Sequence, residues 1–382
     1  MPHGPGPLDG VKVLDFSRVY SGPFCGRALA DLGADVVKVE PPAGDLSRFL
    51  GARSASMSLY HAQQNAGKRN ISLDLNRPEA RTLLLRLAEQ TDIVLENFRP
   101  GVMDRFGLGY DAIAAVNPRV VYASLTGWGQ EGPWRNRRAY AVIVHAEAGL
   151  TSGIIDRGGD ARNDGYSHAD VYAGLECTIG ILAALHHRDH SGEGQQIEIN
   201  LLSSALSALV NQTSAYVAGG VVPNRMGNAH LSLYPYEPMA TGDGELIIAA
   251  GNDRQFRKLV EALGAPHLAD DERFATVLAR NDNRALLAPL LLEKLATKSA
   301  QEWFHILSDV GVPCGPINDV HGGVQLAESL GLEPVVAAGA VSTIRNPIRM
   351  SQTPPRYQLA PPSIGEHSAE IRDWLGFGKA TR

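Results

Sequence analysis

The stretch that decides the fold runs from Val11 to Val39 and reads VKVLDFSRVYSGPFCGRALADLGADVVKV. Its apolar runs at 11–16 and 35–39 predict two buried strands, and the segment 22–32 between them predicts a helix with one apolar face. A strand, a helix and a second strand in this order form the unit from which parallel sheets are built. The pattern therefore predicts an α/β protein.

The same alternation continues along the first half of the chain. Further strands are predicted at 70–75, 92–96, 120–125 and 196–200, with a helix at 78–89. Such alternation favours a mostly parallel, Rossmann-like sheet with helices on both faces.

The turn after the first predicted strand argues against nicotinamide binding. Residues 17–26 read SRVYSGPFCG and lack the G-x-G-x-x-G spacing that lets the backbone approach a pyrophosphate. Glu40 ends the second strand, where an acidic residue would suit a ribose contact. Without the glycines, it is better interpreted as an ordinary strand end.

The second half of the chain predicts a smaller α+β domain. A helix is expected to run from 201 to about 218, and Gly219, Gly220 and Pro223 then mark a change. Later elements are predicted as a strand at 245–250 and helices at 254–263, 284–296 and 300–310. Past Gly315 the prolines predict irregular structure, followed by a final helix at about 365–375.

Composition excludes several classes of protein. The chain has 382 residues, 44% hydrophobic, and a formal net charge of −6, so no basic excess indicates binding to nucleic acid or to an anionic membrane. A phosphate-bearing ligand would need a local basic cluster. Cys25, Cys177 and Cys314 are too few and too scattered for a disulfide framework or a structural zinc site. No metal-ligand spacing is recognisable elsewhere either.

The sequence also predicts where the protein acts. Residues 1–7 lack the apolar run of a signal peptide, and no later stretch is apolar for the length of a membrane span. The few cysteines favour a reducing compartment. We therefore expect a soluble, cytoplasmic protein.

Seven motifs, in order along nearly the whole chain, resemble CoA-transferase family III. This group includes formyl-CoA:oxalate and carnitine CoA-transferases, and the methylacyl-CoA racemases are close relatives. The motifs are Leu8–Phe16, Leu32–Glu40, Gly67–Leu75, Glu96–Gly101, the segment around Thr126 and Gly127, Asp170, and Pro361–His367.

The resemblance implies a fold that composition could not show. Members of this family have a large Rossmann-like domain made from both chain ends, a small inserted domain, and two interlocked subunits. We accordingly expect a large domain at 1–218 and 322–382, a small domain with its linkers at 219–321, and an interlocked homodimer.

Asp170 matches the position of the family's nucleophile. A carboxylate can attack an acyl-CoA, pass through a mixed anhydride, and become an enzyme-bound CoA thioester. Asp170 opens a predicted helix, whose N-terminus stabilises negative charge by roughly 0.3–1 kcal/mol. With an ordinary pKa of about 3.9 it would be ionised without a general base. By position alone it would be an ordinary helix-capping aspartate.

The same resemblance predicts a binding site for coenzyme A. Val19 and Tyr20 match a family loop beside the reacting thiol. Basic side chains that match positions near the CoA phosphates or the thioester are Lys38, Lys68, Arg69, Arg105 and Arg138. For Lys38 and Arg69 surface charge is an equal alternative, because isolated Lys and Arg are mostly exposed.

The motif that distinguishes racemases from transferases is altered here. The racemase Gly-His-Asp element aligns with residues 139–141, where Tyr140 replaces the histidine and Ala141 the aspartate. A two-base racemase is therefore disfavoured, and His145 and His168 are better interpreted as structural histidines. Tyr140 matches a tyrosine that lines the acyl pocket of transferases. Glu237 is closer to the racemase pattern and is a further candidate for the substrate pocket.

Substrate identity stays open between several acids. No run of glycines occurs between 226 and 251, so oxalate is not favoured, and the candidates for shielding the site from water are His230, Tyr234 and Tyr236. Candidates for pairing with the second carboxylate of a dicarboxylic acceptor are Arg138, Arg162 and Arg225.

Three functions follow from these observations. The first is a CoA-transferase that moves CoA from an acyl-CoA donor to a carboxylic acid, with dicarboxylic acids among the candidates. The second is an acyl-CoA racemase or epimerase acting by α-proton exchange, and the third is a non-catalytic CoA-binding protein. In each case coenzyme A is a substrate or ligand, and no prosthetic group is expected.

Overall fold

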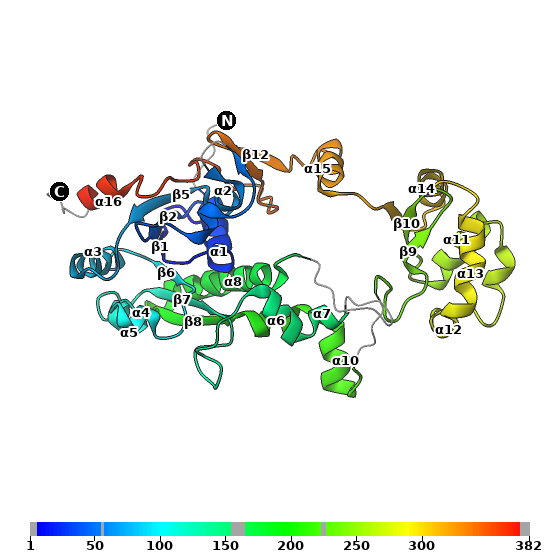
Figure 1. Ribbon diagram of the computed structural model, residues 1–382, viewed down its shortest axis with the longest axis horizontal. Helices are drawn as coiled ribbons and strands as arrows, with labels where there is room; N and C mark the ends of the chain where they lie inside the picture. Colours follow the sequence, from blue (N-terminus) through cyan, green and yellow to red (C-terminus); the bar gives the residue numbers. More distant parts are fainter. Residues whose placement is uncertain (1–5, 55–56, 154–164, 223–226, 375–382) are drawn as a thin grey trace. The chain divides into compact units, whose positions relative to one another are not determined.

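The structure is a computed structural model that describes residues 6–54, 57–153, 165–222 and 227–374 (Figure 1). The chain divides into a large unit, residues 1–148, 165–213 and 332–382, and a small unit, residues 149–164 and 214–331. The predicted boundaries at 218 and 322 differ from these divisions by 5 and 10 residues. Residues 149–153 group with the small unit, although the prediction placed them in the large one.

The sheet of the large unit has six parallel strands in the order β5-β2-β1-β6-β7-β8. The strands are β1 (Lys12–Asp15), β2 (Asp35–Glu40), β5 (Lys68–Ser72), β6 (Ile93–Glu96), β7 (Val121–Thr126) and β8 (Gln195–Asn200). The predicted α/β class is confirmed, and the sheet is wholly parallel. Segments near both ends of the chain belong to the large unit, but in the described residues the sheet takes no strand from 332–374.

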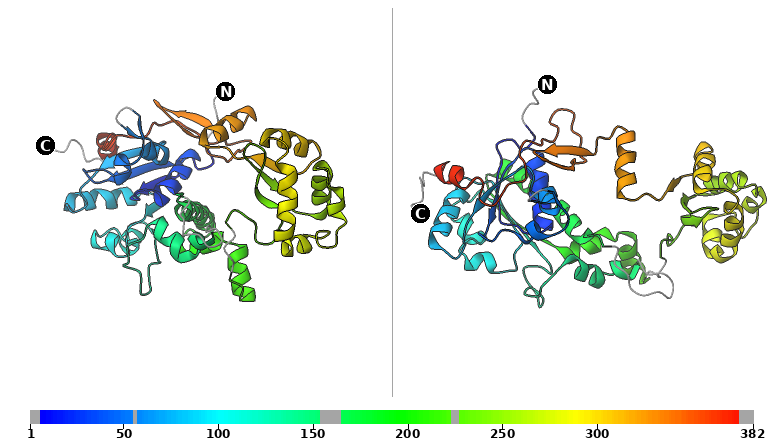
Figure 2. Two further views of the ribbon diagram at one scale, coloured as in Figure 1. Left: turned by 45° about the vertical axis from the view of Figure 1, so that its right-hand side comes forward. Right: turned by 45° about the horizontal axis from the view of Figure 1, so that its top comes forward.

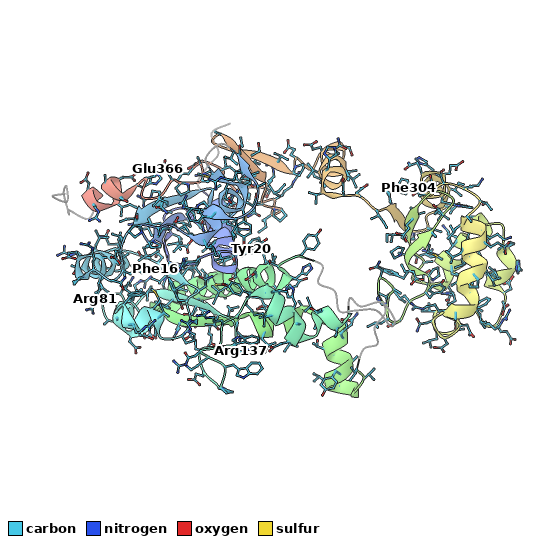
Figure 3. The ribbon with its side chains drawn as sticks, in the orientation of Figure 1. Phe16, Tyr20, Arg81, Arg137, Phe304 and Glu366 are labelled. Atoms are coloured by element: carbon cyan, nitrogen blue, oxygen red, sulfur yellow. The ribbon has the colours of Figure 1, made fainter. Side chains whose placement is uncertain are left out.

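Helices cover both faces of this sheet, as the views in Figures 1 and 2 agree. On one face, α3 (Pro78–Ala88), α4 (Val102–Arg105), α5 (Tyr110–Ala114) and α16 (Ser368–Trp374) bury apolar side chains against the strands. Phe16, labelled in Figure 3, lies in this core. On the other face lie α1 (Ser21–Asp31) and α8 (His168–Ser191).

Shorter elements complete the large unit. They are η1 (Leu46–Phe49), β3 (Arg53–Ser54), β4 (Met57–Ser58), α2 (Leu59–Asn65), α6 (Ala141–Ala148) and α9 (Leu201–Ala208). The single helix predicted from 201 to 218 is two helices, because the chain turns at Val210, which has φ 37°, before α10 (Asn211–Gly219). None of the helices in the described part of the chain is long and apolar enough to cross a membrane.

The C-terminal segment runs along the edge strand β5. The Gly67 amide donates to the Leu359 carbonyl at 2.9 Å, and the Asn70 amide donates to Nδ1 of His367 at 3.2 Å. The prediction of irregular structure past Gly315 was wrong for two elements: α15 (Val320–Ser329), and the hairpin of β12 (Val335–Ala338) and β13 (Val341–Ile344). The five prolines that motivated it, Pro347, Pro354, Pro355, Pro361 and Pro362, all lie beyond this hairpin.

The small unit has its own sheet and its own core. Antiparallel strands β9 (Tyr236–Ala240), β10 (Glu245–Ala249) and β11 (Cys314–Pro316) lie in the order β11-β10-β9. Its other elements are α7 (Leu150–Gly153), α11 (Asp253–Ala262), η2 (Pro266–Ala269), α12 (Val277–Asp282), α13 (Arg284–Leu295), α14 (Ala300–Asp309), α15 and most of α10. Phe256, Leu291 and Trp303 are buried at its centre, and Phe304 packs against them (Figure 3).

Candidate active site

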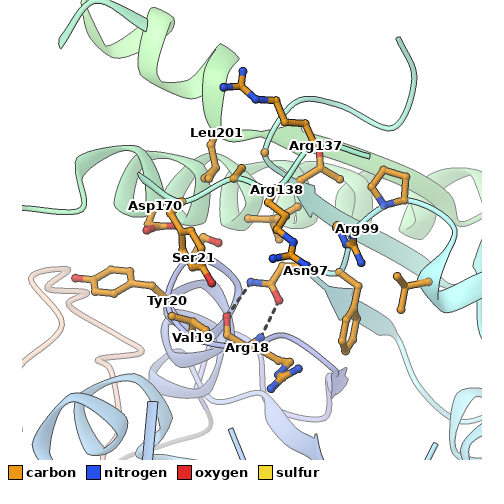
Figure 4. A pocket seen from close by; sticks show the side chains of 18 of the residues that line it. Arg18, Val19, Tyr20, Ser21, Asn97, Arg99, Arg137, Arg138, Asp170 and Leu201 are labelled. Carbon is orange, nitrogen blue, oxygen red and sulfur yellow. Dashed lines mark hydrogen bonds between the residues drawn. The ribbon is translucent and has the colours of Figure 1, made fainter. Parts of the chain in front are cut away.

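A pocket of about 540 Å³ opens at the carboxyl ends of the central strands (Figure 4). The chain leaves β1 toward β2 and β5 on one side, and leaves β6 toward β7 and β8 on the other. The loops that follow β1 and β6 therefore run in opposite directions from two adjacent strands. Such a position is the topological switch point of the sheet, which is where α/β sheets bind ligands. The pocket is lined after β1 by residues 18–21, after β6 by 97–100, after β7 by Gly127 and after β8 by Leu201.

The lining of this pocket is strongly basic. Its charged residues are Arg18, Arg99, Arg105, Arg135, Arg137, Arg138 and one acid, Asp170. Guanidinium groups bind phosphate and carboxylate oxygens through paired hydrogen bonds. The pocket is the local basic cluster that a phosphate-bearing ligand requires in a protein of negative net charge.

Asp170 lies in the first turn of α8, facing the start of α1. The side chain of Ser21, the first residue of α1, lies beside its carboxylate. Burial raises the pKa of Asp170 to about 6, and the interaction with Ser21 opposes part of that rise. The prediction of an ordinary pKa was therefore wrong, although a carboxyl with this pKa is still mostly ionised at neutral pH. Partial desolvation makes such a carboxylate a stronger nucleophile.

Two tyrosines lie beside this carboxylate. Burial and then the charge of Asp170 raise the pKa of Tyr20, and the same two causes raise that of Tyr60. Their rings meet edge to face, with centroids 5.6 Å apart. Both phenols consequently stay protonated at neutral pH and cannot serve as bases.

His145 supports the first turn of α8. It is buried, and its Nε2 accepts a hydrogen bond from the amide of Ala169 at 3.0 Å. The ring of His168 lies between those of His145 and Tyr172, at centroid distances of 5.9 and 6.2 Å. These contacts fit the structural roles expected for both histidines.

Helices α1 and α8 approach each other closely next to the site. A Cβ atom on Gly174, one turn after Asp170, would stand 2.8 Å from the carbonyl oxygen of Ser21 and 3.0 Å from the ring of Phe24. Only glycine allows this approach, which holds Ser21 within hydrogen-bonding reach of the carboxylate.

The structure gathers most of the residues expected at the site. Those that line the pocket are Val19, Tyr20, Arg105, Arg138, Tyr140 and Asp170. Lys38 and Lys68 do not line it, because both are fully buried in ion pairs: Nζ of Lys38 lies 3.2 Å from Asp45, and Nζ of Lys68 lies 2.9 Å from Asp15.

Arg69 and Glu237 also lie outside the pocket lining. Arg69 donates to Asp35 at 2.9 Å and to Glu370 at 2.8 Å. Glu237 belongs to the small unit, 3.7 Å from Nη1 of Arg284, and burial raises its pKa. Arg162 and Arg225 lie outside the described residues.

Several lining residues were not singled out by sequence reasoning: Arg18, Ser21, Asn97, Arg99, Arg135 and Arg137. Four of them directly follow β1 or β6, and that position could have identified them. Arg137 extends on the loop between β7 and α6 (Figure 3), where its guanidinium lies 4.8 Å from the ring of Trp128 and 4.4 Å from that of Trp134. In the described part of the chain, no group of three or more His, Cys, Asp or Glu side chains could hold a metal ion.

Comparison with known proteins identifies the family. Residues 8–368 match CoA-transferase family III. The chain is 37% identical to succinate–glutarate CoA-transferase of Agrobacterium fabrum, over 97% of this chain and 96% of that protein. It is 35% identical to acetyl-CoA:oxalate CoA-transferase of Acetobacter aceti, over 96% and 95%.

A solved structure shares the fold over the same extent. The crystal structure of a CaiB/BaiF family protein from Brucella suis superposes with a TM-score of 0.88 and 38% identity, covering 97% of this chain and all of that one. The chain belongs to CoA-transferase family III, and the protein is a CoA-transferase.

Proposed function

We propose that the protein transfers CoA from an acyl-CoA donor to a dicarboxylic acid acceptor through a covalent intermediate on Asp170. The observation that carries the proposal is the position of this carboxylate. Among the described residues that line the pocket it is the one acid beside six arginines, and the side chain of Ser21 lies next to it.

The first half of the reaction loads the enzyme. The Asp170 carboxylate attacks the thioester carbonyl of the donor, the carbon–sulfur bond breaks, and CoA leaves as a thiolate. The thiolate then attacks the aspartyl carbonyl of the mixed anhydride, which expels the donor acid as a carboxylate and leaves an aspartyl-CoA thioester.

The second half repeats these steps in reverse order. The acceptor carboxylate attacks the aspartyl thioester and forms a second anhydride as the thiolate departs. The thiolate attacks the acceptor carbonyl, which forms the new acyl-CoA and frees the Asp170 carboxylate. No net proton is taken up or released, so the reaction needs no general base.

The excess of arginines supports a dianionic acceptor. Coenzyme A brings its phosphates to the pocket, but they do not require six guanidinium groups, and a second carboxylate on the acceptor would find one such partner. Arg138 is our candidate for either role. The relative from Agrobacterium fabrum is named for two dicarboxylates, succinate and glutarate.

Intact-protein mass spectrometry tests this function. The wild-type protein and Asp170→Ala would be mixed with succinyl-CoA, with and without hydroxylamine. We expect the wild-type mass to rise by one CoA less one water, and hydroxylamine to remove the addition. Asp170→Ala should show no addition. An adduct that persists in Asp170→Ala, or none on either protein with any donor tried, would contradict the proposal.

A matched control separates loss of the nucleophile from loss of the site. Glu147→Gln removes a carboxylate on α6 that pairs with Arg137 but does not line the pocket. It should still form the adduct, whereas Asp170→Asn, which keeps the shape of the side chain, should not.

We also propose that the protein assembles as the interlocked homodimer that the family resemblance implies. Along α8, Tyr172, Leu175 and Ile179 share one exposed face, and Ile179 is 66% exposed. Contiguous exposed apolar residues of this kind mark interaction surfaces. Light scattering of the eluted protein should give twice the mass of the chain, and a monomer would refute the assembly.

A further inference from the structure

The loop between β1 and α1 has a strained backbone at the pocket wall. Val19 has φ 66°, a left-handed conformation that a β-branched residue rarely adopts. Val19, Tyr20 and Ser21 all line the pocket with Asp170. Such strain persists only where the surroundings over-determine it, and it concentrates at functional sites.

A buried ion pair holds this loop from behind. The carboxylate of Asp45 accepts from the Val19 amide at 3.1 and 3.3 Å and from Nζ of Lys38 at 3.2 Å. The same ammonium group donates to the Ser17 carbonyl at 2.8 Å. Lys38 and Asp45 are both fully buried. The pair therefore fixes the loop on both sides of Arg18, directly at Ser17 and through Asp45 at Val19.

Asp45 is suited to accept several donors at once. Burial alone would raise its pKa, but the charge of Lys38 and the amides of Ser47 and Val19 outweigh burial and lower it to about 2. It stays ionised throughout the working range of pH. A charged acceptor makes shorter and stronger hydrogen bonds than a neutral one.

We propose that Lys38 and Asp45 are positioning residues for acyl transfer, which hold Val19 in its left-handed conformation and so keep Tyr20 and Ser21 opposite Asp170. Lys38 then makes no contact with the CoA phosphates. This inference rests on the proposed function, because it assumes that Asp170 is the nucleophile.

A pair of donors distinguishes positioning from phosphate binding. Succinyl-pantetheine has the same thioester as succinyl-CoA but lacks the nucleotide and its phosphates. Asp45→Asn should slow single-turnover loading of Asp170 about 10-fold or more with both donors, since a small misplacement is costly for transfer. The KM for succinyl-CoA should change by less than about 2-fold.

The contrary results are equally specific. A loss confined to succinyl-CoA would show that the pair serves the phosphates, and an unchanged loading rate would show that it positions nothing; either overturns the inference. Failure of the wild-type protein to load at all would instead overturn the proposed function.

Two further variants guard against an unfolded mutant. If Asp45→Asn does not fold, Lys38→Met combined with Asp45→Asn removes both charges, so neither is left buried without its partner. The loading rate of this double variant should then fall equally with succinyl-CoA and with succinyl-pantetheine. Asp31→Asn is the matched control: it breaks another buried ion pair, with Nε of Arg27 at 2.6 Å, on the following helix and away from the pocket. Its loading rate should stay within about 2-fold of wild type.

A double-mutant cycle tests whether the pair acts through Val19. Glycine adopts a φ of 66° without strain, so in a Val19→Gly protein the ion pair no longer has to hold a strained backbone at residue 19. The loss caused by Asp45→Asn should shrink by at least about 3-fold in the Val19→Gly background. An equal loss in both backgrounds would refute the link through the Val19 backbone.

Discussion

The side chain of Asn97 closes a pair of hydrogen bonds with the backbone of Arg18. Its Oδ1 accepts from the Arg18 amide and its Nδ2 donates to the Arg18 carbonyl, both at 2.8 Å (Figure 4). Asn97 follows β6 and Arg18 follows β1, so one amide side chain joins the two loops that separate at the switch point of the sheet.

Replacing Asn97 should damage both stability and catalysis. Asn97→Ala leaves two backbone groups of Arg18 without their partner, so the free energy of unfolding should fall by about 2 kcal/mol. The kcat should fall as well, because the loop that carries Tyr20 and Ser21 loses its tether. Urea unfolding and steady-state transfer measure the two effects.

Asn117→Ala is the control for that prediction. Asn117 donates to the carbonyls of Ala88 at 2.9 Å and Thr91 at 2.7 Å and accepts from the Arg119 amide at 3.1 Å, one bond more than Asn97 makes, but it does not line the pocket. It should destabilise the protein to a similar extent with little effect on kcat. If the two variants lose kcat equally, Asn97 has no special role at the site.

The pH dependence of enzyme loading should report the ionisation of Asp170. The attacking form is the carboxylate, so the single-turnover rate should be half its maximum near pH 6 and should fall about 10-fold per unit below that. In Ser21→Ala the midpoint should lie higher, because the Ser21 hydroxyl lowers this pKa. A midpoint near 4 in the wild type would show that burial does not perturb the group.

The same shift predicts that Asp170 destabilises the folded protein. Its pKa rises from 3.8 to about 6 on folding, so the folded state binds the proton more tightly than the unfolded state. The contribution of Asp170 to stability should therefore decrease as pH rises from about 4 to 6, and then stay level. Asp170→Asn should raise the free energy of unfolding at pH 8 by about 1–2 kcal/mol, allowing for partial exposure, and by almost nothing at pH 3. A stability gain of equal size at both pH values would argue against ionisation as its cause.

Sequence reasoning placed Asp170 in the pocket, but it did not foresee that Lys38 and Lys68 are buried in ion pairs outside the pocket lining. Asp170 could be placed because motif order and a helix start agree at one position. Lys38 matches a family position by alignment, yet in β2 it lies among Val36, Val37 and Val39, and an interior strand of a parallel sheet is buried on both faces. That context indicated a buried lysine with an acidic partner. The sequence could not identify Asp45 as this partner, because the conformation of the loop after β2 determines which acidic side chain reaches Lys38.

Most arginines of the pocket, unlike the two lysines, were not singled out from the sequence although they line the pocket. Arg135, Arg137 and Arg138 come from one loop, and the sequence alone does not show which of them face the cavity. The side chains that follow β1 and β6 can be assigned to the pocket once the strand order is known, because that order places the two loops together. The sequence alone does not supply the strand order.

Arg138 should affect binding of the CoA nucleotide more than the chemical step. Arg138→Gln keeps a polar side chain but removes the charge, so the KM for succinyl-CoA should rise about 10-fold while kcat changes little. With succinyl-pantetheine, which has no phosphates, wild type and variant should be alike. If instead the KM for the acceptor acid rises and that for succinyl-CoA does not, Arg138 binds the second carboxylate of the acceptor.

Gly174 should be indispensable for the approach of α8 to α1. In Gly174→Ala the new methyl group meets the Ser21 carbonyl oxygen at 2.8 Å, a backbone atom that cannot turn aside, so the helices must separate. We expect the unfolding free energy to fall by about 1–3 kcal/mol. The loading rate should fall by about 10-fold or more, because Ser21 moves away from Asp170.

Gly180→Ala, on the same helix, is the control: its methyl group would meet only the Ile197 side chain, at 3.2 Å. A side chain can yield by a few tenths of an ångström, so this variant should load Asp170 at close to the wild-type rate. If both variants load normally, contact between the two helices does not set the geometry of the nucleophile.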